Sequence, residues 1–349
     1  MPKISVLMSA YNCAPYIEES LKSICEQTFT DFEFLIIDDA STDDTWDCLR
    51  EFSENDSRIR LFRNEKNSGV ANSINRMIAK SSGQYIARMD ADDIALPHRF
   101  EKQVEILDSG KADLCGSWMI VFGAGREFLW RTRVEDEEIR CELLFTSAFC
   151  NPTVMLRREL MERHPYDPDT VPAADYDLWV RIAPDAGLCN IPEPLVRYRK
   201  HRGQISQRKN LRQGAVAGKI AVNQLRNLGI NFTEEEGDVH ASIVHSVPPV
   251  SLNEVKASEA WLRKLIGHFE GKPVAQKIIA LRWFRYCLKA AQIGPGVFWI
   301  FSHSSLKQYA CFRPWRYSTI LLLSLFRIRR NSRFYRLLVP WSPVARVKT

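Results

Sequence analysis

The 349-residue sequence contains no C-x-x-C pair and no long apolar run, and it has no acidic residue beyond Glu270. Its nine cysteines are scattered and odd in number, which argues against a zinc site or a disulfide framework and favours a reducing compartment. No stretch reaches the roughly 18 uncharged apolar residues of a membrane-spanning helix. The apolar start, residues 4–8, is too short for a signal peptide and is typical of a first buried strand.

Because acidic residues are absent after Glu270, the two parts of the sequence carry opposite net charges. Residues 271–349 contain fifteen Lys and Arg, whereas residues 1–270 carry an excess of nine acidic residues. Opposite charges of this size indicate two regions with different tasks. Helical patterns prevail beyond about residue 205, with a polar link at 231–238. We therefore expect a domain at 1–207 and a helical region at 208–349 that is basic from about residue 271.

The first hundred residues alternate between two kinds of pattern. Strand-like apolar runs occur at residues 4–9, 32–37, 59–62 and 85–89, with helical patterns between them at 14–27, 41–52 and 70–81. This order predicts an α/β fold with a doubly wound, mostly parallel sheet and helices on both faces. Ligands of such sheets bind at the carboxyl ends of the strands. Asn12, Asp39 and Asp90 lie at such ends.

Three carboxylates, Asp90, Asp92 and Asp93, crowd the end of the fourth apolar run. Carboxylates this close repel one another and raise each other's pKa unless a cation shares them. Hard oxygen ligands suit Mg²⁺ or Mn²⁺ that carries a phosphorylated substrate. A surface acidic turn is the alternative for an isolated D-x-D. The missing Gly and distal Glu exclude an EF-hand loop, and the sequence has no P-loop and no G-x-G-x-x-G motif.

Six ordered sequence blocks strengthen the metal interpretation. They lie at residues 2–12, 27–43, 67–75, 83–93, 174–181 and 198–201. Together these blocks resemble family 2 glycosyltransferases, and the likeness extends over roughly residues 2–207. It implies a GT-A fold, a nucleotide-sugar donor that we expect to be UDP-linked, Mn²⁺ or Mg²⁺, and inversion at the anomeric carbon. The Gln-x-x-Arg-Trp block of processive synthases is absent, so we expect a single addition.

The resemblance assigns residues to the donor diphosphate. By the family's pattern Asp92 ligates the metal, and Asp90 reaches the donor ribose or the metal shell. His201 is placed over the diphosphate as a metal ligand or phosphate donor, with a surface or core histidine as the alternative. Arg199 is a further candidate for the same phosphates.

The nucleotide is expected to contact the loops after the first strands. Asp39 would accept a hydrogen bond from the base, and Tyr11 would stack on the nucleotide or be a half-buried core aromatic. Asp38 is interpreted as a structural hydrogen-bonding residue. The remaining candidate donor-binding residues are Ser9, Asn12, Asn67 and Asn75.

Direct displacement also needs a base for the acceptor hydroxyl. The family places it in a Glu-Asp pair that corresponds to Ala174 and Asp175, so the Glu is missing here. We predict Asp175 as the base. Asp177 is the competitor, although an acidic residue in a helix first turn is also explained by the dipole. The missing Glu leaves a second hypothesis, a catalytically silent module that binds a nucleotide sugar or a partner of a polysaccharide assembly complex.

Residues 317–339 interleave leucines and aromatics with arginines. This pattern fits a segment lying on an anionic membrane, where each basic residue adds about 1 kcal/mol. The alternatives are a core-forming helix pair with a solvated basic face, and a tail that binds a partner protein or closes a dimer. No nucleic-acid motif accompanies the charge. We expect a cytoplasmic enzyme, peripheral on the inner face of the cell membrane, whose saccharide acceptor is lipid-linked and serves bacterial surface polysaccharides.

Overall fold

The chain folds into two compact units. The computed structural model describes residues 1–201, 210–245, 248–310, 312–329, 332–339 and 344–346. The first unit consists of residues 1–139, 147–209 and 343–349, and the second of residues 140–146 and 210–342. The predicted domain boundary at 207/208 lies outside the described residues.

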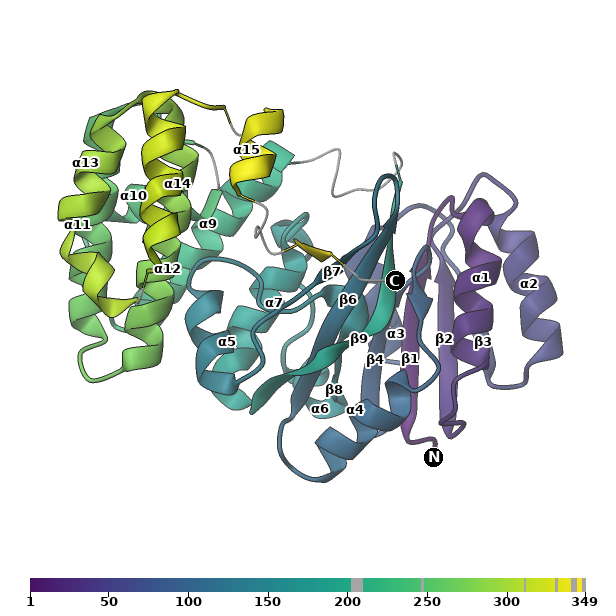
Figure 1. The fold of residues 1–349 in the computed structure, drawn as a ribbon. Coiled ribbons are helices and arrows are strands. Elements are labelled where there is room, and N and C mark those ends of the chain that lie inside the picture. Colours follow the sequence, from purple (N-terminus) through teal and green to yellow (C-terminus); the bar gives the residue numbers. More distant parts are fainter. Residues whose placement is uncertain (202–209, 246–247, 311, 330–331, 340–343, 347–349) are drawn as a thin grey trace. The chain divides into compact units, whose positions relative to one another are not determined.

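The amino-terminal half of the first unit is a parallel sheet in the order β3-β2-β1-β4 (Figure 1). Its strands are β1 (Ile4–Ala10), β2 (Phe32–Asp38), β3 (Ile59–Arg63) and β4 (Tyr85–Asp90). The connecting helices are α1 (Ala14–Cys25), α2 (Thr45–Asn55) and α3 (Val70–Ile78). Helices on both faces explain why β1, β2 and β4 are apolar along most of their length. The predicted doubly wound fold class is confirmed.

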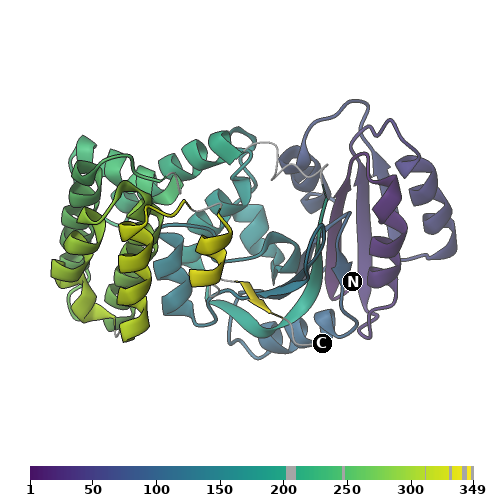
Figure 2. The same cartoon turned by 45° about the horizontal axis from the view of Figure 1, so that its top comes forward.

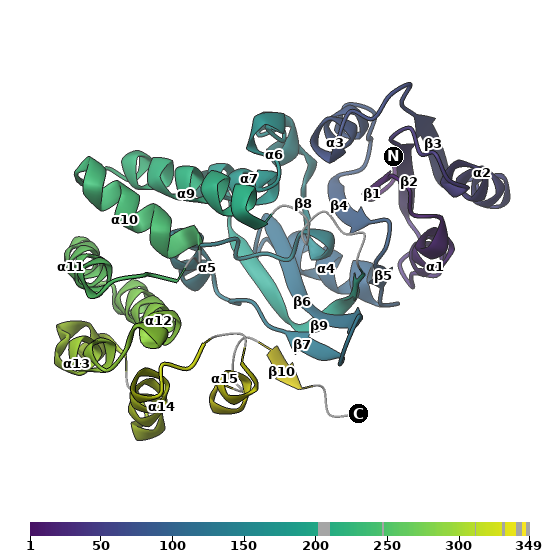
Figure 3. The ribbon, with the colours of Figure 1, turned by 90° about the horizontal axis from the view of Figure 1, so that it is seen from above.

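The order of these strands defines where a ligand can bind. The chain moves outward from β1 to β3 and then returns to β4 on the other side of β1. Because such crossovers are right-handed, α1 and α3 lie on opposite faces of the sheet (Figure 3). The strand order therefore reverses between β1 and β4, and the crevice beyond their carboxyl ends is the topological switch point.

Mostly antiparallel strands complete the ten-stranded sheet. They are β5 (Ile94–Ala95), β6 (Leu114–Gly123), β7 (Phe128–Trp130), β8 (Met155–Arg157), β9 (Leu188–Lys200) and β10 (Val344–Arg346). β9 runs parallel to β6 with register shifts near Trp118, and such irregularities bend a strand. The far end of β9 then pairs with β5, just after the acidic turn.

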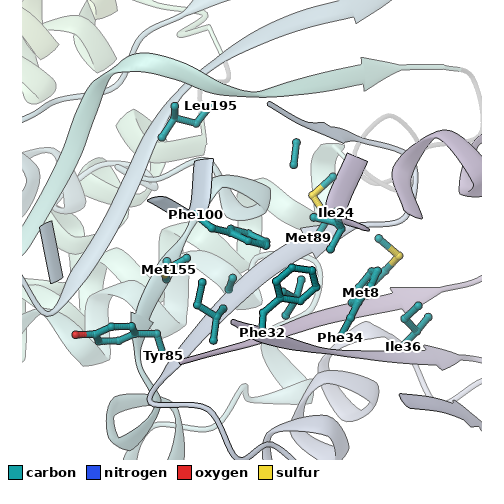
Figure 4. Packing of buried hydrophobic residues seen from close by; sticks show 14 of the residues in the cluster. Met8, Ile24, Phe32, Phe34, Ile36, Tyr85, Met89, Phe100, Met155 and Leu195 are labelled. Carbon is teal, nitrogen blue, oxygen red and sulfur yellow. The ribbon is translucent and has the colours of Figure 1, made fainter. Parts of the chain in front are cut away.

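Helices α1, α2 and α4 (Arg99–Asp108) share one core with the sheet. The remaining helices are α5 (Asp136–Leu143), which belongs to the second unit from residue 140 on, α6 (Arg158–Arg163) and α7 (Ala174–Ile182). Phe32, Phe34 and Phe100 pack in a buried cluster that extends to Met155 of β8 and Leu195 of β9 (Figure 4). The parallel and antiparallel strands are therefore held by continuous apolar packing.

The described residues of the second unit form helices and no strand (Figure 2). These are α9 (Asn210–Asn227), α10 (Glu234–His245), α11 (Leu252–His268), α12 (Pro273–Ala290), α13 (Gly296–His303), α14 (Pro314–Leu325) and α15 (Arg333–Leu338). The predicted polar link at 231–238 is wrong in its second half. Thr233 Oγ1 accepts from the Glu236 N–H, and Glu236 accepts from the Thr233 N–H at 2.9 Å. This reciprocal capping box starts α10.

Candidate functional site

The switch point of the sheet gathers the predicted strand-end residues. Ser9 of β1 stands beside Asp90 of β4 in the register, and beside Ile37 of β2 on its other side. Asn12 and Asp39 follow β1 and β2 directly. The structure thus brings Ser9, Asn12, Asp39 and Asp90 to one edge of the sheet, as predicted from the strand order.

Asn12 joins the loops that follow β1 and β2. Its backbone has a φ of 49°, a left-handed conformation that Asn tolerates better than most residues. Its side-chain oxygen accepts from the Thr42 N–H at 2.8 Å, and its own N–H donates to Ser41 Oγ at 3.0 Å. Asn12 therefore fixes the backbone beside the switch point.

Asp39 is buried and holds the loop after β3. Its carboxylate accepts from the Ser68 N–H at 2.8 Å, the Gly69 N–H at 2.9 Å and Asn64 Nδ2 at 2.7 Å. Burial alone would raise the pKa of Asp39, but these hydrogen bonds outweigh it and lower the pKa. Asp39 is therefore an anion that organises this loop, a role absent from the sequence interpretation. Its predicted hydrogen bond to a base stays a prediction.

A surface hollow lies next to Asp39. Its volume is about 410 Å³, and it is lined by Ala40, Ser41, Arg63, Asn64 and Glu65. A hollow of this size lies within the usual range for small-molecule sites.

Tyr11 and Asp38 differ in how accessible they are. Tyr11 is 49% exposed, so about half of its surface is open to a ligand, and its stacking on the nucleotide stays a prediction. Asp38 is buried and accepts from Arg63 Nε at 3.0 Å and from the Ser41 N–H at 3.2 Å. Asp38 thus has the structural role predicted for it.

The end of β9 meets the acidic turn after β4. His201 Nε2 lies 2.9 Å from Asp92 Oδ2, and its ring centre is 4.5 Å from that of Tyr16. Arg199 Nε donates to the Asp92 carbonyl at 2.8 Å, and its guanidinium also pairs with Glu19. The structure therefore brings Asp92 to Arg199 and His201, although Asp92 lies more than a hundred residues from both in sequence.

Asp93, the third carboxylate of the acidic turn, links this turn to β9. Its Oδ1 accepts from the Arg199 N–H at 2.8 Å, while Oδ2 is buried with no hydrogen-bond partner. Burial raises the pKa of Asp93 well above its ordinary value, and the neighbouring carboxylates Asp92 and Asp90 add to the effect. A protonated Asp93 would join the acidic turn to β9 without adding negative charge.

Two buried arginines beneath the site were missed by sequence reasoning. Arg88 Nη1 donates to the Leu7 carbonyl at 2.8 Å, and Nη2 lies 3.4 Å from Asp90 Oδ1. Arg99 Nη2 donates to the Arg88 carbonyl at 2.7 Å. Arg88 could have been identified from the sequence, because it lies inside an apolar run that is buried on both faces and a charge in that position needs a partner.

Asp90 lies between this positive charge and other carboxylates. Burial raises the pKa of Asp90 to about 6; the charge of Arg88 opposes that rise, and Asp92 and Asp175 add to it. The charge of Asp175 therefore acts on the ionisation of Asp90. A cation at this edge would stabilise the charged forms.

Asp175 occupies the first turn of α7, after the buried Ala174. Burial raises its pKa, while backbone N–H groups of the turn and the charge of Arg88 oppose that rise. Asp177 instead accepts from Arg181 Nε at 2.7 Å, one turn along the same helix. Asp175 has the raised pKa that suits a general base, whereas the Asp177 carboxylate is engaged by Arg181.

Asn67 and Asn75 are placed differently. Asn67 is exposed on the loop held by Asp39. Asn75 Nδ2 donates to the Tyr166 carbonyl at 2.8 Å, and its Oδ1 accepts from the Tyr166 N–H at 2.9 Å. Asn75 therefore secures the segment around the buried Tyr166, which sequence reasoning did not foresee.

The residues present are compatible with a divalent metal. Within the described ranges, no three or more His, Cys, Asp or Glu side chains are arranged as a metal site. Mg²⁺ usually binds through one or two carboxylates together with substrate phosphates and water. The adjoining Asp92 and His201 side chains, with Asp90 nearby, fit that pattern.

Comparison with known proteins places the chain in a family. The sequence model of "Glycosyl transferase family 2" matches residues 5–164. An uncharacterized glycosyltransferase of Haemophilus influenzae is 32% identical over 76% of this chain and 84% of its own length. The Escherichia coli UDP-Glc:alpha-D-GlcNAc-diphosphoundecaprenol beta-1,3-glucosyltransferase WfgD is 30% identical over 64% of this chain and 89% of its own length.

Solved structures share the fold. Residues 1–349 of Staphylococcus aureus TarS in complex with UDP-GlcNAc superpose with a TM-score of 0.55 at 16% identity, covering 92% of this chain and 91% of that one. The mannosyltransferase PcManGT of Pyrobaculum calidifontis, in complex with GDP-Man and Mn²⁺, gives a TM-score of 0.50 at 18% identity, covering 92% and 87%. By its sequence relatives, and in agreement with this fold, the chain belongs to glycosyltransferase family 2.

Proposed function

We propose that this protein is an inverting glycosyltransferase that moves a single sugar from a UDP-linked donor to a hydroxyl of a saccharide acceptor. The observation that carries the proposal is the position of Asp175. It lies in the first turn of α7 with a raised pKa, close enough to Asp90 to affect its ionisation. This electrostatic link supports a site in which Asp175 is the base and Asp90 belongs to the carboxylates that face the diphosphate.

The reaction follows from this arrangement. The Asp175 carboxylate accepts the proton of the acceptor hydroxyl, and the oxygen of that hydroxyl forms a bond to the anomeric carbon. The bond between that carbon and the diphosphate breaks on the opposite side, and the nucleoside diphosphate leaves with the electron pair. Attack from the side opposite the leaving group inverts the anomeric centre.

The leaving diphosphate needs cationic stabilisation. Asp92 and His201, with Asp90 beside them, would hold Mn²⁺ or Mg²⁺. The metal would neutralise the charge that develops on the diphosphate. Support comes from the 2.9 Å approach of Asp92 and His201, and from the Mn²⁺ present with the archaeal mannosyltransferase.

The nucleotide would lie across the ends of β1 to β3. The hollow of about 410 Å³ offers room beside Asp39, and the exposed Tyr11 is available to stack on the base or ribose. Ser9, Asn12 and the exposed Asn67 would complete the donor site. Asn75 and Arg199 would act through the backbone segments that they hold.

We propose a lipid-linked acceptor in the synthesis of a bacterial surface polysaccharide. The support is the name of WfgD, which acts on a diphosphoundecaprenol-linked sugar. An O-antigen biosynthesis glycosyltransferase of Escherichia coli, WbnJ, is also similar to this chain. None of the helices in the described ranges is both long and apolar enough to cross a membrane. The proposal places the enzyme as a peripheral protein on the inner face of the cell membrane, where it would meet such an acceptor.

Donor hydrolysis tests this proposal against the silent module. We expect wild-type protein with Mn²⁺ to hydrolyse one member of a panel of UDP-, dTDP- and GDP-sugars. Asp92→Ala should abolish turnover and weaken nucleotide binding only when metal is present. Nucleotide binding without turnover of any donor would favour the silent module, and normal turnover by Asp92→Ala would contradict the metal assignment.

A further inference from the structure

Exposed apolar side chains are concentrated near the end of the second unit. Half of the large hydrophobic side chains that are exposed in the described residues fall between positions 315 and 337. They belong to α14, the turn after it and α15, and each is between 38% and 73% exposed. These residues are Trp315, Leu321, Leu322, Leu325, Phe326, Phe334 and Leu337.

Helix α14 is apolar on more than one face. Ile320 and Leu323 are fully buried, as expected for the side that packs against the other helices. Leu321, Leu322 and Leu325 are exposed on the remaining surface. Exposed apolar side chains gathered in one segment often mark a site of contact with a protein or a membrane. We therefore expect the exposed side of α14 to contact an apolar partner.

The same segment is positively charged. Arg313, Arg327, Arg329 and Arg333 are exposed in the same stretch of the sequence as these apolar residues, and the sequence has no acidic residue after Glu270. We call these four arginines and the seven apolar residues the α14–α15 surface. Apolar side chains interleaved with arginines match the interface of an anionic bilayer, which offers hydrocarbon and negative headgroups together.

A second copy of the chain is a poorer match. A two-fold symmetric contact would place the α14–α15 surface against itself. Its four exposed arginines would then face one another with no acidic residue of this surface between them. A nucleic acid would satisfy the arginines, but it would leave the leucines and phenylalanines of this surface without an apolar partner.

We infer that the α14–α15 surface inserts its apolar side chains into the interface of an anionic lipid bilayer. At twelve residues, α14 is too short to span the hydrocarbon layer, so it would lie in the plane of the interface. The inference deepens the membrane location within the proposed function by naming the side chains that enter the lipid. It does not depend on the transferase chemistry.

Point substitutions on the full chain test this insertion better than truncation, because α14 also contributes buried side chains. Variant A combines Leu325→Ser, Phe326→Ser, Phe334→Ser and Leu337→Ser, and variant B combines Arg327→Gln, Arg329→Gln and Arg333→Gln. Variant A has a control with two exposed apolar residues, and variant B has a control with the same number of basic residues, both elsewhere on the second unit. The apolar control is Leu228→Ser with Val250→Ser, and the charge control is Lys219→Gln with Lys256→Gln and Arg263→Gln; all five control positions are exposed.

Sedimentation with phosphatidylcholine vesicles, with and without phosphatidylglycerol, is the measurement. We expect wild type and both controls to bind the anionic vesicles, with part of the binding surviving high salt. Variant A should lose the salt-resistant part. Variant B should bind about a hundredfold more weakly, because each basic residue contributes about 1 kcal/mol. Donor hydrolysis in solution should be unchanged in all variants, so a failed membrane result is distinct from a failed transferase assignment.

Several results would overturn the inference. These are no binding by wild type, equal binding by wild type and variants A and B, and equal losses in the variants and their matched controls. A concentration-dependent dimer that variant A abolishes would assign the surface to a second copy. Binding of an RNA homopolymer in preference to anionic vesicles would assign it to nucleic acid.

Discussion

At the scale of single residues, the site depends on side chains that hold other parts of the protein in position. Asp39 organises the loop after β3, Asn12 joins two loops, and Arg88 places a buried positive charge beside Asp90. Burial of Asp39 and Arg88 requires hydrogen bonds, which both residues make to backbone groups. A residue that a sequence motif assigns to ligand binding can therefore act mainly by holding the loops of the site in position.

Asn75 allows these two roles to be separated. We expect Asn75→Ala to lower the free energy of unfolding by about 1–3 kcal/mol, because it leaves the N–H and carbonyl of Tyr166 without partners. Donor affinity, measured by calorimetry, should stay near the wild-type value. Asn67→Ala, on an exposed loop residue, is the comparison and should leave stability unchanged. A tenfold loss of donor affinity in Asn75→Ala at wild-type stability would show that Asn75 binds the donor directly.

At the scale of elements, buried polar contacts fix helices of the second unit. His240 of α10 is fully buried; its Nδ1 accepts from Trp261 Nε1 at 3.1 Å, and its Nε2 lies 2.9 Å from the Leu144 carbonyl. Both ring nitrogens are satisfied only when the imidazole is neutral and Nε2 carries the proton. Burial lowers the pKa of His240 to about 4, and the charge of Arg282 acts in the same direction.

The stability of this unit should therefore depend on pH. Because the pKa of His240 is lower in the folded state, the unfolded chain binds the proton more readily. Its stabilising contribution is complete above about pH 6.5, the unfolded pKa, and is lost as the pH falls towards 4. The loss should amount to about 3 kcal/mol.

Urea unfolding between pH 7 and pH 4 measures this dependence. His240→Phe should be less stable at pH 7 but should have a shallower pH dependence than wild type. His268→Gln changes an exposed histidine and is the control, which should keep the wild-type dependence. An equally steep fall in His240→Phe and wild type would contradict the assignment to His240.

At the scale of the whole molecule, the sequence predicted the parallel strands and the residues at their carboxyl ends. Those predictions depend on local patterns, apolar runs and the polar residues that follow them. The hydrogen bond between Asn75 and Tyr166 links residues 91 positions apart, and the one between Asp93 and Arg199 links residues 106 apart. Local sequence patterns cannot predict hydrogen bonds between residues so far apart. The same is true of residues 140–146, which join the second unit although they lie far from it in sequence.

The central claim is that Asp175 takes the proton of the acceptor. The most direct test compares Asp175→Asn with Asp177→Asn, using the donor identified by hydrolysis and a saccharide acceptor for that donor. We predict that Asp175→Asn keeps donor affinity and lowers kcat by a factor on the order of 10² to 10⁴, while Asp177→Asn keeps most of the wild-type kcat. A loss of this size in Asp177→Asn, with Asp175→Asn near wild type, would contradict the account.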